Sequence, residues 1–172
     1  MAQADADIEA PAAPGFTPRD FRDAMGQFAT GVVVLSTGSG DDAHAMTANA
    51  FMSGSLDPVL VLVSVAKTAR MHGRLLQAGH YGVSVLSGAQ HWVSNHFAGR
   101  PEPDRAPVFE ALDGTPVVSG AIVRLAASLR HAYDCGDHTL FVGEVQALEL
   151  DRAQDQPLLY YGGGYRAVAA PN

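Results

Sequence analysis

The sequence predicts a mainly β protein of the α+β class, with a barrel-like sheet and about three short helices. Apolar runs of strand length recur along the chain, most of them are separated by short turn-type segments, and only three segments carry helix start signals. At 172 residues, 47% of them hydrophobic, the chain suits one domain with a full core. We expect this domain to span residues 16–168, between a disordered N-terminal tail (1–15) and a short C-terminal tail (169–172).

The first helix is expected to begin after Thr17. This residue suits the N-cap, Pro18 suits the first helical position, and Asp20 suits the first turn. Gly31 is expected to end the helix, and Val32 then begins the first strand. Three apolar residues recur at helical spacing and should form one buried face: Phe21, Met25 and Phe28.

A polar stretch, His44–Pro58, lies between two apolar strand-like runs. Neutral hydrogen-bonding side chains alternate there with small or apolar residues, namely Thr47, Asn49, Ser53 and Ser55. A row of such groups beside buried strands suggests a binding surface, here called the polar wall (residues 47–56). Its ligand would be large, with polar edges and an otherwise flat or apolar surface. The alternative is a solvated edge strand that ends in an ordinary Asp-Pro turn.

The next elements follow from apolar patterning and capping residues. Val59–Val65 lacks polar alternation, which predicts a strand covered on both faces. Thr68 is expected to cap the second helix, and Gly79 to stop it. Tyr81–Leu86 alternates and is expected to form a half-buried strand.

A third helix and two long strands complete the domain. Ser87 and Gln90 have capping-box spacing, so this helix should run from there to about residue 97 and bury Trp92 or Val93. The Pro-rich segment 100–107 is expected to be a loop over a site or partner. The two long strands are expected at Ala121–Tyr133, with alternate residues from Ala121 to Leu129 on one face, and at Thr139–Leu150.

Composition excludes several classes of function. A net charge of −7 gives no electrostatic support for a nucleic-acid surface. The single cysteine, Cys135, cannot form an internal disulfide and fits a reducing compartment. With no signal-peptide pattern and no bilayer-length apolar run, we expect a cytoplasmic protein without a membrane partner. Dinucleotide-fingerprint, phosphate-loop and nucleophile-elbow motifs are absent from the sequence, and its histidines and cysteine form no convincing metal site.

The order of the motifs along the chain resembles the flavin reductase-like family. The matching segments are FRDAMGQFATGVVVLST (21–37), AMTANAFMSGSLDPVLVLVSV (45–65), KTAR (67–70), HFAG (96–99), GTPVVSGAIVRL (114–125), GDHTLFVGEV (136–145) and PLLYYGGGYR (157–166). The resemblance implies an FMN-binding split barrel, usually a homodimer. It also implies an NAD(P)H-dependent flavin reductase that supplies reduced FMN or FAD to a partner monooxygenase.

The resemblance also suggests which residues bind the non-covalent flavin. The positions that line its ring and ribityl chain are Thr47, Ala48, Asn49, Ser53, Ser55 and Leu56. Lys67 and Thr68, with Arg70, resemble the phosphate-binding positions, and cations beside a helix start suit an anion. A solvated turn lysine is the alternative for Lys67. Phe97 either lies near the flavin or packs at the helix end.

The candidate for the nicotinamide site is the turn Gly136-Asp137-His138, where NADH or NADPH would be the co-substrate; the alternative is a β-hairpin turn with a surface histidine. His138 could hydrogen-bond the nicotinamide carboxamide or balance charge on the reduced flavin, while Asp137 orients it or shapes the turn. Tyr165 could cover the site or belong to C-terminal packing. A flavin-binding electron-transfer or sensor module with little turnover is the second hypothesis, because fold alone does not fix function.

Overall fold

The computed structural model describes residues 15–153 and 156–168. The expected tails at 1–14 and 169–172 lie outside the described residues. Within the described part, the helices are α1 (Pro18–Met25), α2 (Arg70–Ala78) and α3 (His91–Phe97), with 3-10 turns η1 (Gly40–Asp42) and η2 (Gly88–Gln90). The strands are β1 (Thr30–Gly31), β2 (Val33–Thr37), β3 (His44–Ala48), β4 (Phe51–Leu56), β5 (Val59–Ala66), β6 (His80–Val85), β7 (Phe109–Leu112), β8 (Thr115–Val118), β9 (Val123–Cys135), β10 (His138–Leu150), β11 (Leu159–Tyr161) and β12 (Gly164–Arg166).

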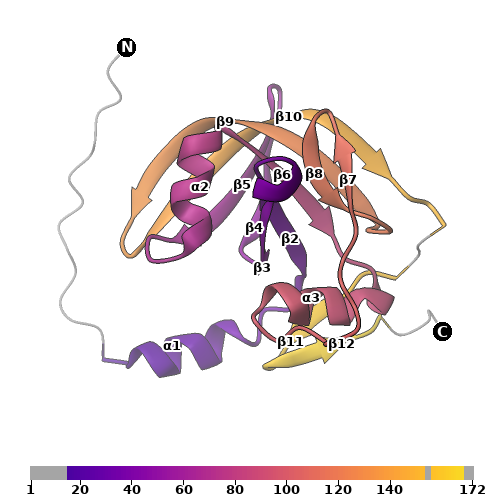
Figure 1. The fold of residues 1–172 in the computed structure, drawn as a ribbon. Coiled ribbons are helices and arrows are strands. Elements are labelled where there is room, and N and C mark those ends of the chain that lie inside the picture. Colours follow the sequence, from indigo (N-terminus) through magenta and orange to yellow (C-terminus); the bar gives the residue numbers. More distant parts are fainter. Residues whose placement is uncertain (1–14, 154–155, 169–172) are drawn as a thin grey trace, which may run out of the picture.

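A curved seven-stranded antiparallel sheet dominates the molecule (Figure 1). Its strand order is β3-β2-β6-β9-β10-β5-β4, so the two edge strands are consecutive in the chain. Two small sheets, β1-β11-β12 and the hairpin β7-β8, lie beside it. The mainly β architecture with three short helices, expected from the sequence, is confirmed for the described residues.

Two neighbouring expectations about strand burial are wrong, and for opposite reasons. Strand β6 was expected to be half-buried, but its four central residues are all buried. The hairpin β7-β8 covers its second face, with the backbone amide of Val118 donating to Ser84 Oγ at 2.8 Å. Strand β5 was expected to be covered on both faces, but only Val61, Val63 and Val65 are buried, because the residues between them face a side that this chain covers only partly.

Helix α1 begins as predicted but buries nothing. Thr17 and Asp20 form a reciprocal capping box, with Pro18 following the cap. The helix ends at Met25, not at Gly31, and none of its residues is buried. The expected buried face is wrong for the single chain because α1 lies away from the main sheet (Figure 1). Its apolar side chains are largely exposed: Phe21 55%, Met25 49% and Phe28, just beyond it, 69%.

The second helix starts later than the sequence suggested. Ala69, not Thr68, is the N-cap of α2, and no side chain bonds the free amides there. A tight turn, in which the Ala69 amide donates to the Ala66 carbonyl at 2.9 Å, delays the helical conformation. Gly79 ends the helix with φ +68°, as predicted, and both Met71 and Leu75 are fully buried.

The third helical segment begins with the predicted capping box. Ser87 and Gln90 form it, although the first turn is the 3-10 turn η2 and α3 follows. Val93 is the buried residue of the two candidates, at 1% exposure, while Trp92 packs against the same cluster from its edge.

The long hairpin β9-β10 was correctly expected, but its face does not alternate throughout. Leu125, Ala126 and Ala127 are all buried, so both faces of β9 are covered at this point, opposite a register shift in β10 between Val145 and Ala147. The expected neighbours on that face, Val123 and Leu129, are only half-buried, and Ala121 is buried just before the strand.

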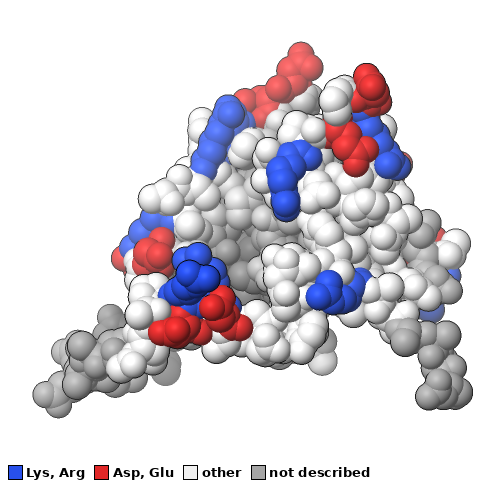
Figure 2. Space-filling model, turned by 90° about the horizontal axis from the view of Figure 1, so that it is seen from below, with Lys and Arg blue, Asp and Glu red and all other residues white. Residues whose placement is uncertain are grey.

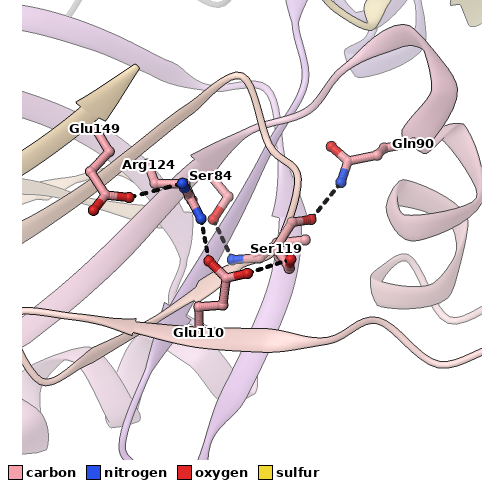
Figure 3. A network of polar contacts seen from close by, with 7 residues as sticks. Ser84, Gln90, Glu110, Ser119, Arg124 and Glu149 are labelled. Atoms are coloured by element: carbon pink, nitrogen blue, oxygen red, sulfur yellow. Dashed lines mark hydrogen bonds and ion pairs between the residues drawn. The ribbon is translucent and has the colours of Figure 1, made fainter. Parts of the chain in front are cut away.

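A polar network holds the β7-β8 hairpin against the sheet (Figure 3). Arg124 of β9 pairs with Glu110 of β7 and, at 2.9 Å, with Glu149 of β10. The Gln90 side-chain amide donates to the carbonyl of Ser119 at 2.9 Å, linking the end of η2 to the segment after the hairpin. Because these bonds join segments far apart in sequence, they fix the cover over β6.

Among the described residues, no helix is long and apolar enough to cross a membrane.

Candidate functional site

Asn49 and Ala50 connect the two edge strands, β3 and β4. The first half of the polar wall, residues 47–49, lies at this connection. The Thr47 hydroxyl donates to the carbonyl of Ser94 at 2.7 Å, which ties the wall to α3. Since that bond uses the hydroxyl proton, the Thr47 oxygen keeps only acceptor capacity for a ligand. Asn49 is exposed, so both its donor and its acceptor can face a ligand.

A cavity of about 200 Å³ opens against this junction. Its lining residues are Val32, Thr47, Ala48, Asn49, Ser94, Ala98, Arg100, Tyr160 and Tyr165. Tyr165 comes from β12 near the C-terminal end, and its hydroxyl lies 2.8 Å from Ser94 Oγ and 3.1 Å from Asn95 Oδ1. The tyrosine is therefore fixed to α3, and four of the predicted flavin residues share one cavity.

The second half of the wall lies elsewhere. Ser53, Ser55 and Leu56 are on β4, the outer edge of the sheet, and do not line the cavity. Leu56 is 89% exposed, and Ser55 Oγ accepts a hydrogen bond from the Asp57 amide at 3.2 Å. In this single chain these residues match the alternative drawn from the sequence, a solvated edge strand before an Asp-Pro turn.

A second group of predicted residues gathers where β5 ends. His138 pairs with Ala66, and the amide of Lys67 donates to the carbonyl of Asp137 at 3.0 Å. A backbone hydrogen bond links the polar wall to strand β5, which leads to this second group. The amide of Ser64 in β5 donates to the carbonyl of Ala50 at 3.0 Å. Lys67 is the third residue after Ser64, which corresponds to roughly 10 Å along a strand.

The imidazole of His138 is oriented by its neighbour. Its Nδ1 lies 2.7 Å from Asp137 Oδ1, and a carboxylate can only accept, so Nδ1–H is the donor. The hydrogen bond from His138 lowers the pKa of Asp137 below its usual value, which keeps the carboxylate ionised. In neutral His138, Nε2 is therefore left as an acceptor, available to a ligand N–H. Gly136 supports this turn with φ +61°.

The start of α2 carries positive charge. Burial lowers the pKa of His44 below its ordinary value, and the nearby Arg70 and Arg74 guanidinium groups lower it further, against the opposing effect of Asp42. Thr68 and Arg70 are exposed beside the uncapped amides of α2. Free amides and cations together favour an anion at this end of the helix.

From below, Figure 2 shows a central hollow with Lys and Arg side chains around its rim.

Phe97 does not line the cavity. Its ring lies 5.7 Å from that of Phe109 and packs against the cluster around Val93. This position matches packing at the helix end, the second of its two interpretations.

Two cavity residues, Arg100 and Ser94, were not singled out as flavin positions by the sequence. Arg100 is at the start of the expected excursion loop, and its amide donates to the Asn95 carbonyl at 2.9 Å. Farther along that loop, the Arg105 guanidinium lies 3.7 Å from the centre of the Trp92 ring. The only available signal was the position of Arg100 directly after the HFAG segment.

The described residues hold no group of three or more His, Cys, Asp or Glu side chains that could bind a metal ion. Cys135 is free and exposed at the tip of the β9-β10 hairpin.

Comparison with known proteins assigns the family. The model of the flavin reductase like domain matches residues 25–169. The chain belongs to this family. An NADH-dependent flavin reductase of Rhodococcus sp is 45% identical over 159 residues, which cover 90% of this chain and 89% of the relative. The reductase component of 4-hydroxyphenylacetate 3-monooxygenase from Thermus thermophilus is 40% identical over 88% of this chain and 97% of its own.

Solved structures agree with this assignment. The flavin reductase PheA2 superimposes on this flavin reductase-like chain with a TM-score of 0.86, at 42% identity over 90% of this chain and 100% of its own. The NADH:FAD oxidoreductase SgcE6 of Streptomyces globisporus, in complex with NAD and FAD fragments, gives a TM-score of 0.80 at 34% identity, covering 91% and 98%.

Proposed function

We propose that this protein is a flavin reductase that passes hydride from NADH to FMN or FAD and supplies the reduced flavin to a partner monooxygenase. The observation that carries the proposal is the backbone connection between the Thr47–Asn49 wall, Lys67 and the Asp137-His138 pair. The relatives support it, since several are NADH-dependent flavin, FAD or FMN reductases and one is a monooxygenase reductase component.

The donor set fits a flavin. Neutral groups of Thr47, Asn49 and Tyr165, with the Arg100 guanidinium in the same cavity, suit the polar edge of a large ring, whereas the ammonium of Lys67 suits phosphate oxygens. None of these side chains carries a negative charge. When bound, the flavin and the nicotinamide supply the hydride chemistry themselves.

The contribution of the protein is then orientation. The wall residues and Lys67 hold the two ends of the flavin, and the turn at 136–138 holds the nicotinamide. His138 Nε2, left as an acceptor by the bond to Asp137, accepts from the carboxamide N–H of the nicotinamide. This assigns Asp137 as the positioning residue for His138. Thr68, Arg70 and the α2 amides complete the anion-binding end, while Ser53, Ser55 and Leu56 line the flavin only if another chain closes the β4 edge.

The activity is tested by following the loss of nicotinamide absorbance with purified protein. We expect NADH oxidation to be fast when FMN or FAD is added and negligible without flavin, and NADPH to be the poorer donor. Heat-denatured protein with the same flavin is the control. If flavin binds but neither nucleotide is oxidised, the reductase proposal fails and a flavin-binding electron-transfer or sensor module takes its place.

A homodimer forms part of the proposal. The apolar residues of segment 92–97 are largely packed within their own chain. Exposed large apolar side chains occur on several elements, among them Phe21 and Met25 on α1 and Met52 and Val59 on β4-β5. An apolar helix face left open to solvent, such as that of α1, is a candidate interaction surface. We also propose that the curved sheet with consecutive edges is the split barrel, that residues 16–168 form one domain, and that the protein is cytoplasmic without a nucleic-acid partner.

The dimer is tested by sedimentation. We expect the purified protein to sediment as a dimer, and the double variant Phe21→Ser, Met25→Ser to shift toward monomer, because it removes two apolar side chains from the uncovered face of α1. Arg19→Ser on the same helix is the matched control, since Arg19 is polar and exposed. A wild-type protein that sediments as a monomer and still reduces flavin would contradict the dimer.

A further inference from the structure

We propose that Asp134 is a counter-ion that competes with the flavin phosphate for Lys67 and so keeps the flavin exchangeable. The inference rests on the proposed function, in which Lys67 contacts that phosphate. It comes from an ion pair that the flavin site does not need: Asp134 Oδ1 lies 3.0 Å from Lys67 Nζ.

The backbone holds the two charged groups together without help from a ligand. Asp134 stands near the end of β9, directly before the turn that leads to His138. Lys67 follows the last residue of β5, and its amide donates to the carbonyl of Asp137 in the same turn. Strand β10 pairs with both β9 and β5, so the segments that carry the carboxylate and the ammonium are held on either side of the start of β10.

The Asp134 carboxylate is easily replaced on Lys67 by another anion. The Asp134 side chain is 85% exposed and that of Lys67 is 38% exposed, so water screens their attraction. The phosphate monoester of FMN carries more charge than a carboxylate and can replace it on Lys67. It must then lie close to the freed carboxylate of Asp134, which repels it. The ionised carboxylate of Asp137, near enough to Lys67 for that ammonium to lower the Asp137 pKa, adds to the repulsion.

Only phosphorylated flavins are subject to this competition. Riboflavin has the same ring and ribityl chain without the phosphate, so its binding does not involve Lys67. A weaker hold on FMN or FAD suits a reductase whose reduced product must leave for another protein. Asp134 is thus a residue that sets the ratio of FMN to riboflavin affinity.

The test compares Asp134→Asn with the wild type by titrating the quenching of flavin fluorescence at low ionic strength. We expect the Kd of FMN to fall by about two- to fivefold and that of riboflavin to stay the same. The difference should shrink as salt is added, because salt screens exposed charges. Asp113→Asn, in the β7-β8 turn, makes the same charge change; Asp113 has φ +47°, which asparagine tolerates.

The same substitution in a Lys67→Met protein completes a double-mutant cycle. In a Lys67→Met protein, Asp134→Asn should no longer strengthen FMN binding, because its partner is gone. An unchanged ratio of FMN to riboflavin affinity in Asp134→Asn overturns the inference, and so does equal tightening of both ligands or an effect that persists without Lys67. Failure of the proposed function is a separate result, namely a wild-type protein that does not oxidise NADH with any flavin.

Discussion

Replacing His138 with alanine is expected to lower kcat/KM for NADH by about 100-fold, which corresponds to about 2.7 kcal/mol of transition-state stabilisation. In the proposed site, Nε2 of His138 holds the carboxamide that orients the nicotinamide over the flavin. The loss of that contact lets the ring move, and small displacements of reacting atoms have large effects on rate. Steady-state kinetics with NADH varied at saturating FMN measure the effect.

The same variant separates the nicotinamide site from the flavin site. The Kd of FMN should stay within about twofold of the wild type, which is an energy difference below 0.5 kcal/mol at about 1.4 kcal/mol per tenfold. His131→Ala, an identical change at an exposed position on the same hairpin, is the control and should retain activity. Near-normal kcat/KM in His138→Ala would remove His138 from the mechanism, and loss of FMN binding would reassign it to the flavin.

Replacing Gly82 with alanine is expected to destabilise the protein by at least about 3 kcal/mol, which lowers Tm by roughly 6–12 °C. Gly82 lies in β6, where β8 crosses close above the sheet. A Cβ there would meet the carbonyl oxygen of Pro116 and, at 2.8 Å, the hydroxyl of Ser36. The Pro116 oxygen is backbone and also accepts a hydrogen bond from Ser36, so it has little freedom to move.

Urea unfolding at fixed protein concentration measures this change as a fall in the midpoint with little change in slope. Gly73→Ala is the matched control, because nothing lies within 4 Å of the added Cβ in the exposed middle of α2. Alanine there should stabilise the helix by about 0.5–1 kcal/mol. Equal stability of the Gly82→Ala and Gly73→Ala proteins would mean that β8 does not pack on β6 as described.

These two expectations differ in what the sequence could supply. The GDH segment was identified from the order of motifs, so His138 was a candidate before any contact was known. The sequence gives no sign of the constraint at Gly82, because it depends on Pro116 of strand β8, more than thirty residues later.

The sequence by itself determined the family and several of the local starts and stops, although not the end of the first helix, which comes at Met25 and not at Gly31. The Thr17–Asp20 and Ser87–Gln90 capping boxes and the Gly79 stop are each decided within a few residues, so local chemistry is enough to predict them. Thr68 is not the N-cap of α2, because the chain forms a backbone turn from Ala66 to Ala69 before the helix begins.

The tertiary structure alone decided burial and the composition of the site. Whether β5 or β6 is covered on its second face depends on which distant segment packs there, and an apolar run does not reveal its cover. In the same way, Arg100 and Ser94 join Thr47 in one cavity, and Asp134 meets Lys67, only because strand pairing and the packing of α3 bring separate segments together.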